Sequence, residues 1–308
     1  MITNVRCLLL SIALLPLGAI SMSATATAPT SHCPTHQAIY PQLQTQGLCL
    51  WGQLTPGALV RGQLPAGSKL WLDEQAVKVN GQGYFAFGFD RDAKLEHSLS
   101  WQLPPQVGTD SRQQQVLQLT PRQYKIQQVT GIAKKIMQPD PKDVARATLD
   151  SQQVNRARAI DSDGMAFVSE FMWPLQGRIS GVYGSQRVYN GEPGRPHFGV
   201  DIAAPRGTKA MAPADGVVTL AVPDMFYSGG TLIVDHGNGV NSTFLHLDKL
   251  LVNVGQSIKQ GEVIALVGST GRSTGPHLDW RLNWFNTRLD PATIVPAMTK
   301  PTAKSKAK

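Results

Sequence analysis

The chain has 308 residues, enough for two domains of ordinary size that each bury a core. Charged residues make up 16% of it, and 29 glycines and 21 prolines are present, which argues against wholesale disorder and favours β-structure joined by tight turns. The formal net charge of +8 at pH 7 favours anionic polymers as partners.

Residues 1–28 are typical of an export signal. Arg6 precedes a mostly apolar run from Cys7 to Ile20, which is shorter than the roughly 20 apolar residues of a membrane helix and is interrupted by Pro16. We expect this signal peptide to be cleaved, with an uncleaved anchor as the alternative, and no membrane span afterwards. Cleavage removes one positive charge, Arg6, and leaves +7. A basic exported chain is expected to meet bacterial cell wall or lipid head groups rather than nucleic acid.

Two cysteines, Cys33 and Cys49, remain after the signal. An even number in an exported chain predicts a disulfide, worth about 3 kcal/mol for a loop of this length. Two free thiols are the alternative, and an oxidising compartment disfavours them.

An accessory β-sandwich is predicted over residues 29–134. Short apolar or alternating runs recur there at intervals of about ten residues, separated by Gly, Pro, Asn and Asp. These runs are Leu59–Leu64, Leu70–Leu72, Val77–Val79, Tyr84–Phe89, His97–Leu103, Val116–Leu119 and Tyr124–Ile126. The aromatic residues of this half fit either a sugar-binding platform or, as is more usual in a sandwich, its core: Trp51, Trp71, Tyr84, Phe85 and Trp101.

A helical connector is predicted over residues 135–171. Asp140 followed by Pro141 makes a plausible helix start, and the segment from Val144 to Ile160 holds few large apolar residues. Such a helix is expected on the surface or between domains, with Gly164 ending it.

An antiparallel β-sheet domain is predicted over residues 172–298, so the whole fold is expected to be mainly β. Most connections between its strand runs are too short for helices. The runs are Arg178–Tyr183, His197–Ile202, Gly216–Ala221, Thr231–His236, Val240–His246, Val263–Val267 and His277–Trp284. Residues 299–308 form a basic tail that is expected to be disordered.

Metal-binding side chains concentrate in this C-terminal domain. On the last predicted strand, His277, Asp279 and Arg281 alternate and therefore share one face. His197 and Asp201 lie on or beside a second strand, and His246 ends a third, so five groups that could hold or serve a metal fall in one sheet.

Four motifs resemble the lysostaphin/LytM-type zinc metallopeptidases that cut peptidoglycan peptides. They occur in the family's order, over about residues 172–295, and are Pro196-His-Phe-Gly-Val-Asp201, Asp235-His-Gly-Asn-Gly, Phe244-Leu-His246-Leu and Gly271-Arg-Ser-Thr-Gly-Pro-His277-Leu. The resemblance implies that His197 and Asp201 bind Zn²⁺. It also implies that His246 and His277 are the catalytic histidines beside the reacting water and the scissile carbonyl.

Asp279 departs from this pattern, because the family has its third zinc-ligand histidine there. Aspartate also ligates zinc, so one histidine and two carboxylates would form the site. Two anionic ligands would cancel the charge of Zn²⁺ and leave a bound water less acidic. The alternative is that Asp279 forms a salt bridge with Arg281 in a site without metal.

The function expected from the resemblance is zinc-dependent endopeptidase cleavage of peptidoglycan cross-links in the periplasm of a Gram-negative cell. The alternative is a catalytically weak or inactive module that binds cell wall or activates an amidase, with a divisome partner left open. We expect the loop Gly184–Pro196 to form a wall of the substrate groove. His236 is interpreted as structural.

Overall fold

The computed structural model describes residues 42–45, 47–107, 111–130 and 140–298. The predicted signal peptide, Cys33 and the basic tail lie outside these ranges. Cys49 is disulfide-bonded. Among the described residues, no helix combines the length and the apolar character needed to cross a membrane.

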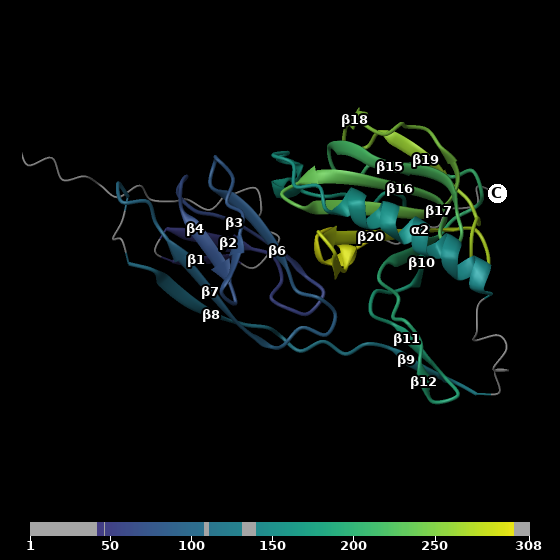
Figure 1. The fold of residues 1–308 in the computed structure, drawn as a ribbon, viewed down its shortest axis with the longest axis horizontal. Coiled ribbons are helices and arrows are strands. Elements are labelled where there is room, and N and C mark those ends of the chain that lie inside the picture. The colour runs from purple at the N-terminus through teal and green to yellow at the C-terminus, as the bar shows by residue number, and fades with distance from the viewer. Residues whose placement is uncertain (1–41, 46, 108–110, 131–139, 299–308) are drawn as a thin grey trace, which may run out of the picture.

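Two four-stranded sheets form the N-terminal half (Figure 1). Their strand orders are β1-β2-β3-β6 and β5-β4-β7-β8. The bounds are β1 Gln42–Thr45, β2 Leu48–Trp51, β3 Leu59–Gln63, β4 Lys69–Leu72, β5 Gln75–Val77, β6 Tyr84–Gly88, β7 Glu96–Gln102 and β8 Gln113–Gln118. Phe85 and Trp101 are fully buried in a core that both sheets share, which confirms the predicted sandwich. Sequence reasoning missed β1 and β2.

The predicted strand at Tyr124–Ile126 does not belong to the sandwich. The chain instead forms β9 (Ile126–Val129), which pairs in parallel with β11 (Gln186–Tyr189); β11 also pairs with β12 (Glu192–Pro193). The sequence of β9 is Ile-Gln-Gln-Val, and its side chains are largely exposed. Such a strand offers a sandwich core little apolar surface, and its backbone hydrogen bonds are formed with the C-terminal half.

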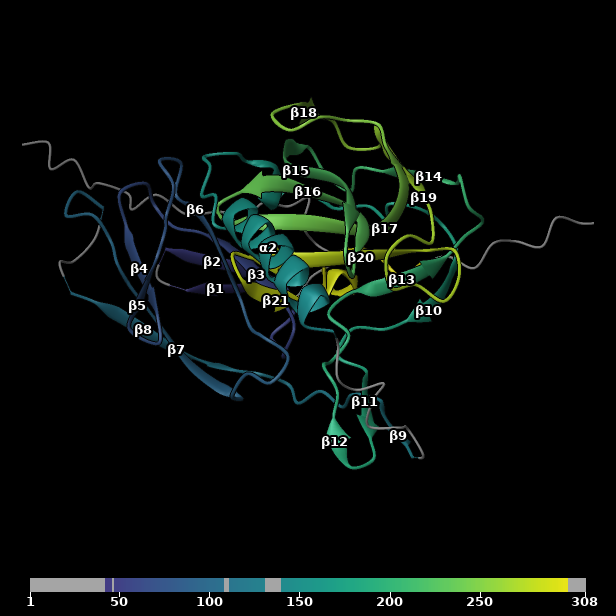
Figure 2. The same ribbon diagram turned by 45° about the vertical axis from the view of Figure 1, so that its right-hand side comes forward.

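The C-terminal half is one large antiparallel sheet of ten strands (Figure 2). Seven of them follow the order β10-β13-β20-β17-β16-β15-β18, and the other three, β14, β19 and β21, pair with strands of this path or with each other. The bounds are β10 Arg178–Gly181, β13 Val200–Ala203, β14 Lys209–Met211, β15 Gly216–Met225, β16 Gly229–Gly237, β17 Val240–Leu250, β18 Ser257–Ile258, β19 Val263–Val267, β20 His277–Trp284 and β21 Thr287–Leu289. The seven predicted runs all overlap observed strands. The short strands β11, β12, β14, β18 and β21 were not predicted.

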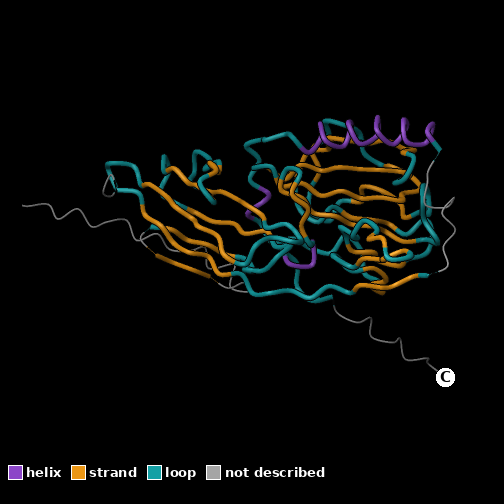
Figure 3. The backbone as a smooth tube through the Cα atoms, turned by 60° about the horizontal axis from the view of Figure 1, so that its bottom comes forward, coloured by secondary structure: helices purple, strands orange, loops and turns teal. Residues whose placement is uncertain are grey.

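One α-helix, α2 (Pro141–Arg158), lies along the C-terminal sheet in the described part of the chain (Figure 3). Asp140 caps it by accepting a hydrogen bond from the Lys142 amide, as the sequence predicted. Ala157 packs against Leu220, Met225 and Ile233 of β15 and β16. The helix ends at Arg158, before the predicted stop at Gly164. Two 3₁₀ turns, η2 (Ala166–Val168) and η3 (Pro291–Thr293), complete the elements.

The two halves share a packed boundary. Leu59 of β3 and Ala86 of β6 belong to the core cluster of the C-terminal sheet. Arg91 donates from Nε to the Gly184 carbonyl oxygen at 2.9 Å, and Arg122 pairs with Asp290. These contacts fix the sandwich against the sheet and hold the chain leading into β9 beside it.

Candidate metal centre

Strand β20 presents the predicted polar face. Its alternate residues Leu278, Trp280 and Leu282 are fully buried in the core, so His277 and Asp279 project from the opposite side. Asp201 of β13 is directly opposite Asp279 in the antiparallel register, which brings the two carboxylates together.

His197, Asp201 and Asp279 form one group. A potential ligand atom from each lies within 4.8 Å of the other two. His197 Nε2 and Asp201 Oδ1 are 3.2 Å apart, and both are buried without a hydrogen-bond partner among the described residues. Burial lowers the pKa of His197, but the carboxylates of Asp201 and Asp279 outweigh it and raise that pKa above its ordinary value. His197 precedes β13 and does not lie in the strand predicted to start there.

Asp279 is only 2% exposed and is bound by Arg281. Arg281 donates from Nε to both carboxylate oxygens at 3.0 and 3.1 Å, and from Nη2 to Oδ2 at 2.6 Å. Burial alone would raise the pKa of Asp279, but the Arg281 guanidinium holds it well below its usual range. The salt bridge expected as an alternative therefore exists.

Arg281 does not exclude metal at Asp279, because an ionised carboxylate has about four lone-pair positions and can serve two partners. It also alters the expected charge. Asp201, Asp279 and Arg281 together carry a net charge of −1, the same as one aspartate with two neutral histidines. The predicted loss of positive charge at a bound zinc is thus offset by Arg281, which the sequence analysis considered only as a partner of Asp279 in a site without metal. His197 Nε2 and Asp201 Oδ1 are 3.2 Å apart, are buried and form no hydrogen bond with a described residue, so the donor set fits Zn²⁺.

Both carboxylates lie against glycines. A Cβ added to Gly181 would approach Asp201 Oδ2 to 2.2 Å, and one added to Gly199 would approach Asp279 Oδ1 to 2.2 Å. The backbone thus leaves the room that the two acidic side chains occupy.

His246 reaches the site through an unusual backbone conformation. Leu245 is paired with Asp279, and regular alternation would send the next side chain to the other face. The left-handed conformation of His246, with φ of 63°, breaks that alternation, and its ring centroid lies 4.8 Å from that of His277. Such conformations cost about 1–3 kcal/mol and are concentrated at functional sites.

Each of these two histidines has one ring nitrogen in use. Nδ1 of His246 donates to the Thr270 carbonyl oxygen at 2.8 Å, and Nδ1 of His277 donates to the Gly275 carbonyl oxygen at 2.8 Å. Nε2 is therefore left as the proton acceptor in both neutral rings. Burial lowers the pKa of His246, which favours its neutral form. Nε2 of His277 lies 3.8 Å from Asp201 Oδ1.

His236, which the sequence analysis left out of the site, has a structural environment. It is 1% exposed; Nδ1 donates to the Asp215 carbonyl oxygen at 2.7 Å, and Nε2 accepts from the Ser242 hydroxyl at 2.9 Å. Burial lowers the pKa of His236 to about 4.

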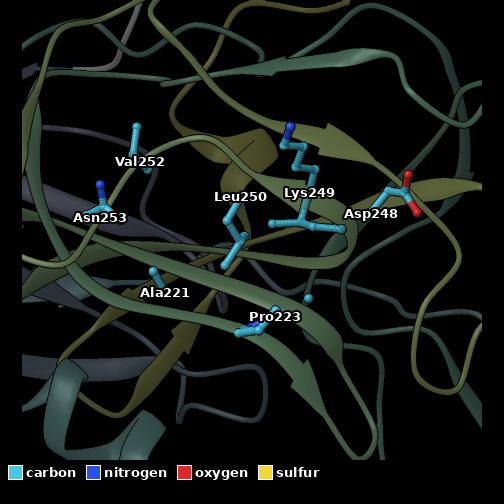
Figure 4. A pocket seen from close by; sticks show the side chains of 9 residues that line it. Ala221, Pro223, Asp248, Lys249, Leu250, Val252 and Asn253 are labelled. Atoms are coloured by element: carbon cyan, nitrogen blue, oxygen red, sulfur yellow. The ribbon is translucent and has the colours of Figure 1, made fainter.

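A groove of about 940 Å³ opens at His197 and Asp201. Ser185 and Arg187, from the loop predicted to form a wall, line it. Lys125 and Gln127 line it too, so the chain around β9 supplies a wall that sequence reasoning missed. A smaller pocket of about 320 Å³ between β15 and β17, shown in Figure 4, contains none of the metal-group residues.

A β-sheet carrying a histidine and two aspartates beside two further histidines defines a metallopeptidase-type centre. The family model described as Peptidase family M23 matches residues 195–291. Peptidoglycan DD-endopeptidase ShyB of Vibrio cholerae is 42% identical over 95 residues, 31% of this chain and 22% of ShyB. DD-carboxypeptidase/endopeptidase Mpg of Neisseria meningitidis is 41% identical over 101 residues, 33% of this chain and 23% of Mpg.

Structural similarity extends further along the chain. A crystal structure of a Pseudomonas aeruginosa protein described as a peptidase M23 superposes with a TM-score of 0.60 at 27% identity, covering 79% of this chain and 95% of that one. Residues 195–291 of this chain thus carry an M23 peptidase domain, in agreement with the resemblance of the four motifs to the lysostaphin/LytM-type enzymes. The chain covers only about a fifth of the length of the curated relatives, 22% and 23% for ShyB and Mpg.

Proposed function

We propose that this protein is a zinc-dependent endopeptidase that hydrolyses peptide cross-links of peptidoglycan in the periplasm. The observation that carries the proposal is the convergence of three potential ligands beside two further histidines. The ligands are His197, Asp201 and Asp279, and the histidines are His246 and His277. The substrate class follows from ShyB and Mpg, which are named as peptidoglycan DD-endopeptidase and DD-carboxypeptidase/endopeptidase and which this chain resembles over its C-terminal domain.

In this proposal His197, Asp201 and Asp279 hold Zn²⁺. The ion would supply Lewis acidity toward the scissile carbonyl and lower the pKa of water in its coordination shell. Arg281 keeps Asp279 ionised and oriented, as outer partners of ligating carboxylates do. The glycine backbone at Gly181 and Gly199 fixes where both carboxylates lie.

His246 and His277 handle the proton and the developing negative charge. His246 is neutral near pH 7, and its Nδ1–H bond to Thr270 aims Nε2 away from the backbone to accept a proton. His277 is oriented in the same way by Gly275, and its Nε2 lies on the Asp201 side of the centre. Once protonated, either ring stabilises an adjacent oxyanion.

A second candidate is a non-catalytic module that binds cell wall or activates an amidase. The observation that favours it is the Asp279–Arg281 ion pair, which satisfies the buried carboxylate without a metal. Replacement of His246 by Ala separates the candidates in cells. It abolishes the role of an enzyme and leaves that of a binding module intact, at equal protein levels.

The test in vitro is the zinc content of the purified mature protein together with digestion of isolated cell wall. About one zinc per chain, new peptide ends, and loss of both on chelation are the expected results. Zinc-free protein that releases no peptide ends after zinc is added would contradict the proposal.

A further inference from the structure

A cavity of about 300 Å³ lies beneath helix α2, which contributes part of its wall. Four arginines line it: Arg158, Arg195, Arg281 and Arg288. Asp150 is the one acidic residue in its wall, and its carboxylate accepts a hydrogen bond from the Phe226 amide at 2.8 Å. The cavity wall is therefore strongly cationic.

Three of the arginines have no carboxylate partner among the described residues. Arg158, at the end of α2, is 8% exposed; Nη2 donates to the Thr243 hydroxyl at 3.0 Å, and its buried Nε has no hydrogen-bond partner. Arg195 makes no ion pair with a described residue, and Arg288 lies with its guanidinium over the Phe198 ring at 4.4 Å. Arg281 donates hydrogen bonds from Nε and Nη2 to Asp279, and its Nη1 has no partner among the described residues.

Bringing four arginines together is unfavourable here, because Asp279 forms their one ion pair among the described residues and Asp150 is the one carboxylate in the cavity wall. Burial, followed by the charges of the other three arginines, lowers the pKa of Arg158 to about 9, and burial with Arg195 and Arg281 lowers that of Arg288 to about 10. Each guanidinium has five N–H donors in total, and several of those in the cavity have no acceptor among the described residues. A bound anion would relieve the repulsion between the arginines and accept hydrogen bonds from these donors.

The cavity adjoins the groove through Arg195, which lines both. A peptide that lies in the groove at His197 and Asp201 can therefore extend an acidic group past Arg195 to Arg158. The cavity is too small for a folded partner and matches a single side-chain or terminal group.

We propose that the arginine cavity is a subsite that binds a free carboxylate of the peptide substrate. Arginine is the residue best suited to this task, since its planar fork pairs with both carboxylate oxygens. The proposal rests on the proposed function for the identity of the peptide, because the peptides of bacterial cell wall carry free carboxylates. The subsite would position the cross-link over the metal group, and α2 would provide one wall of it.

The test is calorimetric binding to the full mature protein after chelation, so that nothing is hydrolysed. The probes are cross-linked cell-wall peptides with free carboxylates and the same peptides with every carboxylate amidated. We expect the free form to bind at least tenfold more tightly. Arg195→Gln and Arg158→Gln should each remove about tenfold of that preference. Arg156→Gln, which removes an exposed charge from the same helix, should leave it unchanged.

Thermal unfolding checks whether the Arg158→Gln variant folds. If that variant does not fold, the Arg195→Gln variant still tests the proposal, because Arg195 lies on a loop. Equal binding of free and amidated peptides overturns the proposal, as does an equal loss in Arg156→Gln. Binding of inorganic phosphate that free peptide does not displace would also overturn it, since the cavity then serves a separate anion. If the protein binds the free peptide more tightly but the zinc-loaded protein cleaves neither peptide, the subsite proposal stands and the proposed enzymatic function is rejected. If the zinc-loaded protein cleaves the free and the amidated peptide equally well, the enzymatic function stands and the subsite proposal is rejected.

Discussion

Histidines in the two halves of the molecule are used differently. In the sandwich, His97 has contacts at both ring nitrogens, 2.6 Å to Asp73 Oδ2 and 3.0 Å to the Lys94 carbonyl oxygen. In the C-terminal sheet, His246 and His277 each use one nitrogen, and the buried Nε2 of His197 has no hydrogen-bond partner. His236 lies in the same sheet but resembles His97, since both of its nitrogens are engaged.

Leaving a buried polar atom unpaired costs about 1–3 kcal/mol, so a fold retains such atoms where a ligand or a reaction compensates. Trp51 Nε1 in the sandwich is also buried without a hydrogen-bond partner among the described residues, so the contrast between the two halves is limited to their histidines. His97 has a structural environment, and the open ring nitrogens at the face of β13 and β20 support the proposed metal centre.

The largest expected effect tests whether the unpaired atoms are metal ligands. Asp279→Ala should lower zinc affinity at least about 100-fold and reduce activity to background, because two protein ligands seldom hold zinc. Metal titration with a chromogenic chelator measures it. Asp248→Ala, which removes an exposed partner of Arg206, is the matched control. Zinc affinity equal to that of the wild type would remove Asp279 from the site.

A change in stability is expected at the partner of Asp279. Arg281→Gln leaves a buried carboxylate without its countercharge and should destabilise the metal-free protein by about 3–5 kcal/mol. Saturating zinc should recover much of this loss, since the metal replaces the missing positive charge. Urea unfolding with and without zinc measures both. A loss that zinc does not change would show that Arg281 and Asp279 act only as a structural pair.

A pH effect is expected at the structural histidine of the sheet. The pKa of His236 is about 4, below the ordinary 6.5, so its unfolded form binds a proton first as the pH falls. Stability that is present above pH 6.5 is lost toward pH 4, about 2 kcal/mol of it by pH 5. Urea unfolding above pH 6.5 and at pH 5 should show this loss of stability in the wild type. The His236→Gln variant should lack the part of the loss that comes from protonation of His236. An unchanged pH dependence in the variant would contradict it.

The smallest effect is expected in the sandwich. Trp51, Phe85 and Trp101 are buried, which leaves Trp71 and Tyr84 partly exposed. Tyr84 packs against the core of the C-terminal sheet, and the Arg112 guanidinium covers the Trp71 ring at 4.3 Å. Trp71→Ala should change binding to isolated cell wall less than about twofold, because no aromatic platform is presented. A larger loss in cosedimentation, with unchanged thermal unfolding, would assign carbohydrate binding to this half.

Local patterns predicted the large sheet and the face of β20 because alternation and turn residues act over a few positions. The i, i+2 spacing placed Asp279 and Arg281 together, but not the bidentate geometry or the charge balance. The position of His246 at the site was predicted only from the family resemblance. Strand alternation would have put its side chain on the opposite face, because the alternation rule does not anticipate a left-handed φ.

Contacts between segments that are far apart in the sequence could not be predicted. Arg158, Arg195 and Arg288 come from a helix, a loop and a strand, and no periodic signal links them. The weak apolar face of α2 indicated a surface helix without showing which face of the sheet it covers. The parallel pairing of β9 with β11 joins residues about sixty positions apart and leaves no local trace.

The glycines beneath the two carboxylates make this centre vulnerable to very small heritable changes. A single methyl group at position 199 would meet Asp279 Oδ1 at 2.2 Å and the Trp280 carbonyl oxygen at 2.9 Å, while every proposed ligand and catalytic residue stayed intact. A lineage could thus silence the enzyme by a change of Gly199 to Ala, which alters one motif at a position that is not a ligand. A change of Gly181 to Ala would meet Asp201 Oδ2 at 2.2 Å and leave all four motifs intact. In surveys of genomes, the residues at positions 181 and 199 therefore deserve the same weight as the ligands when active members are told from silent ones.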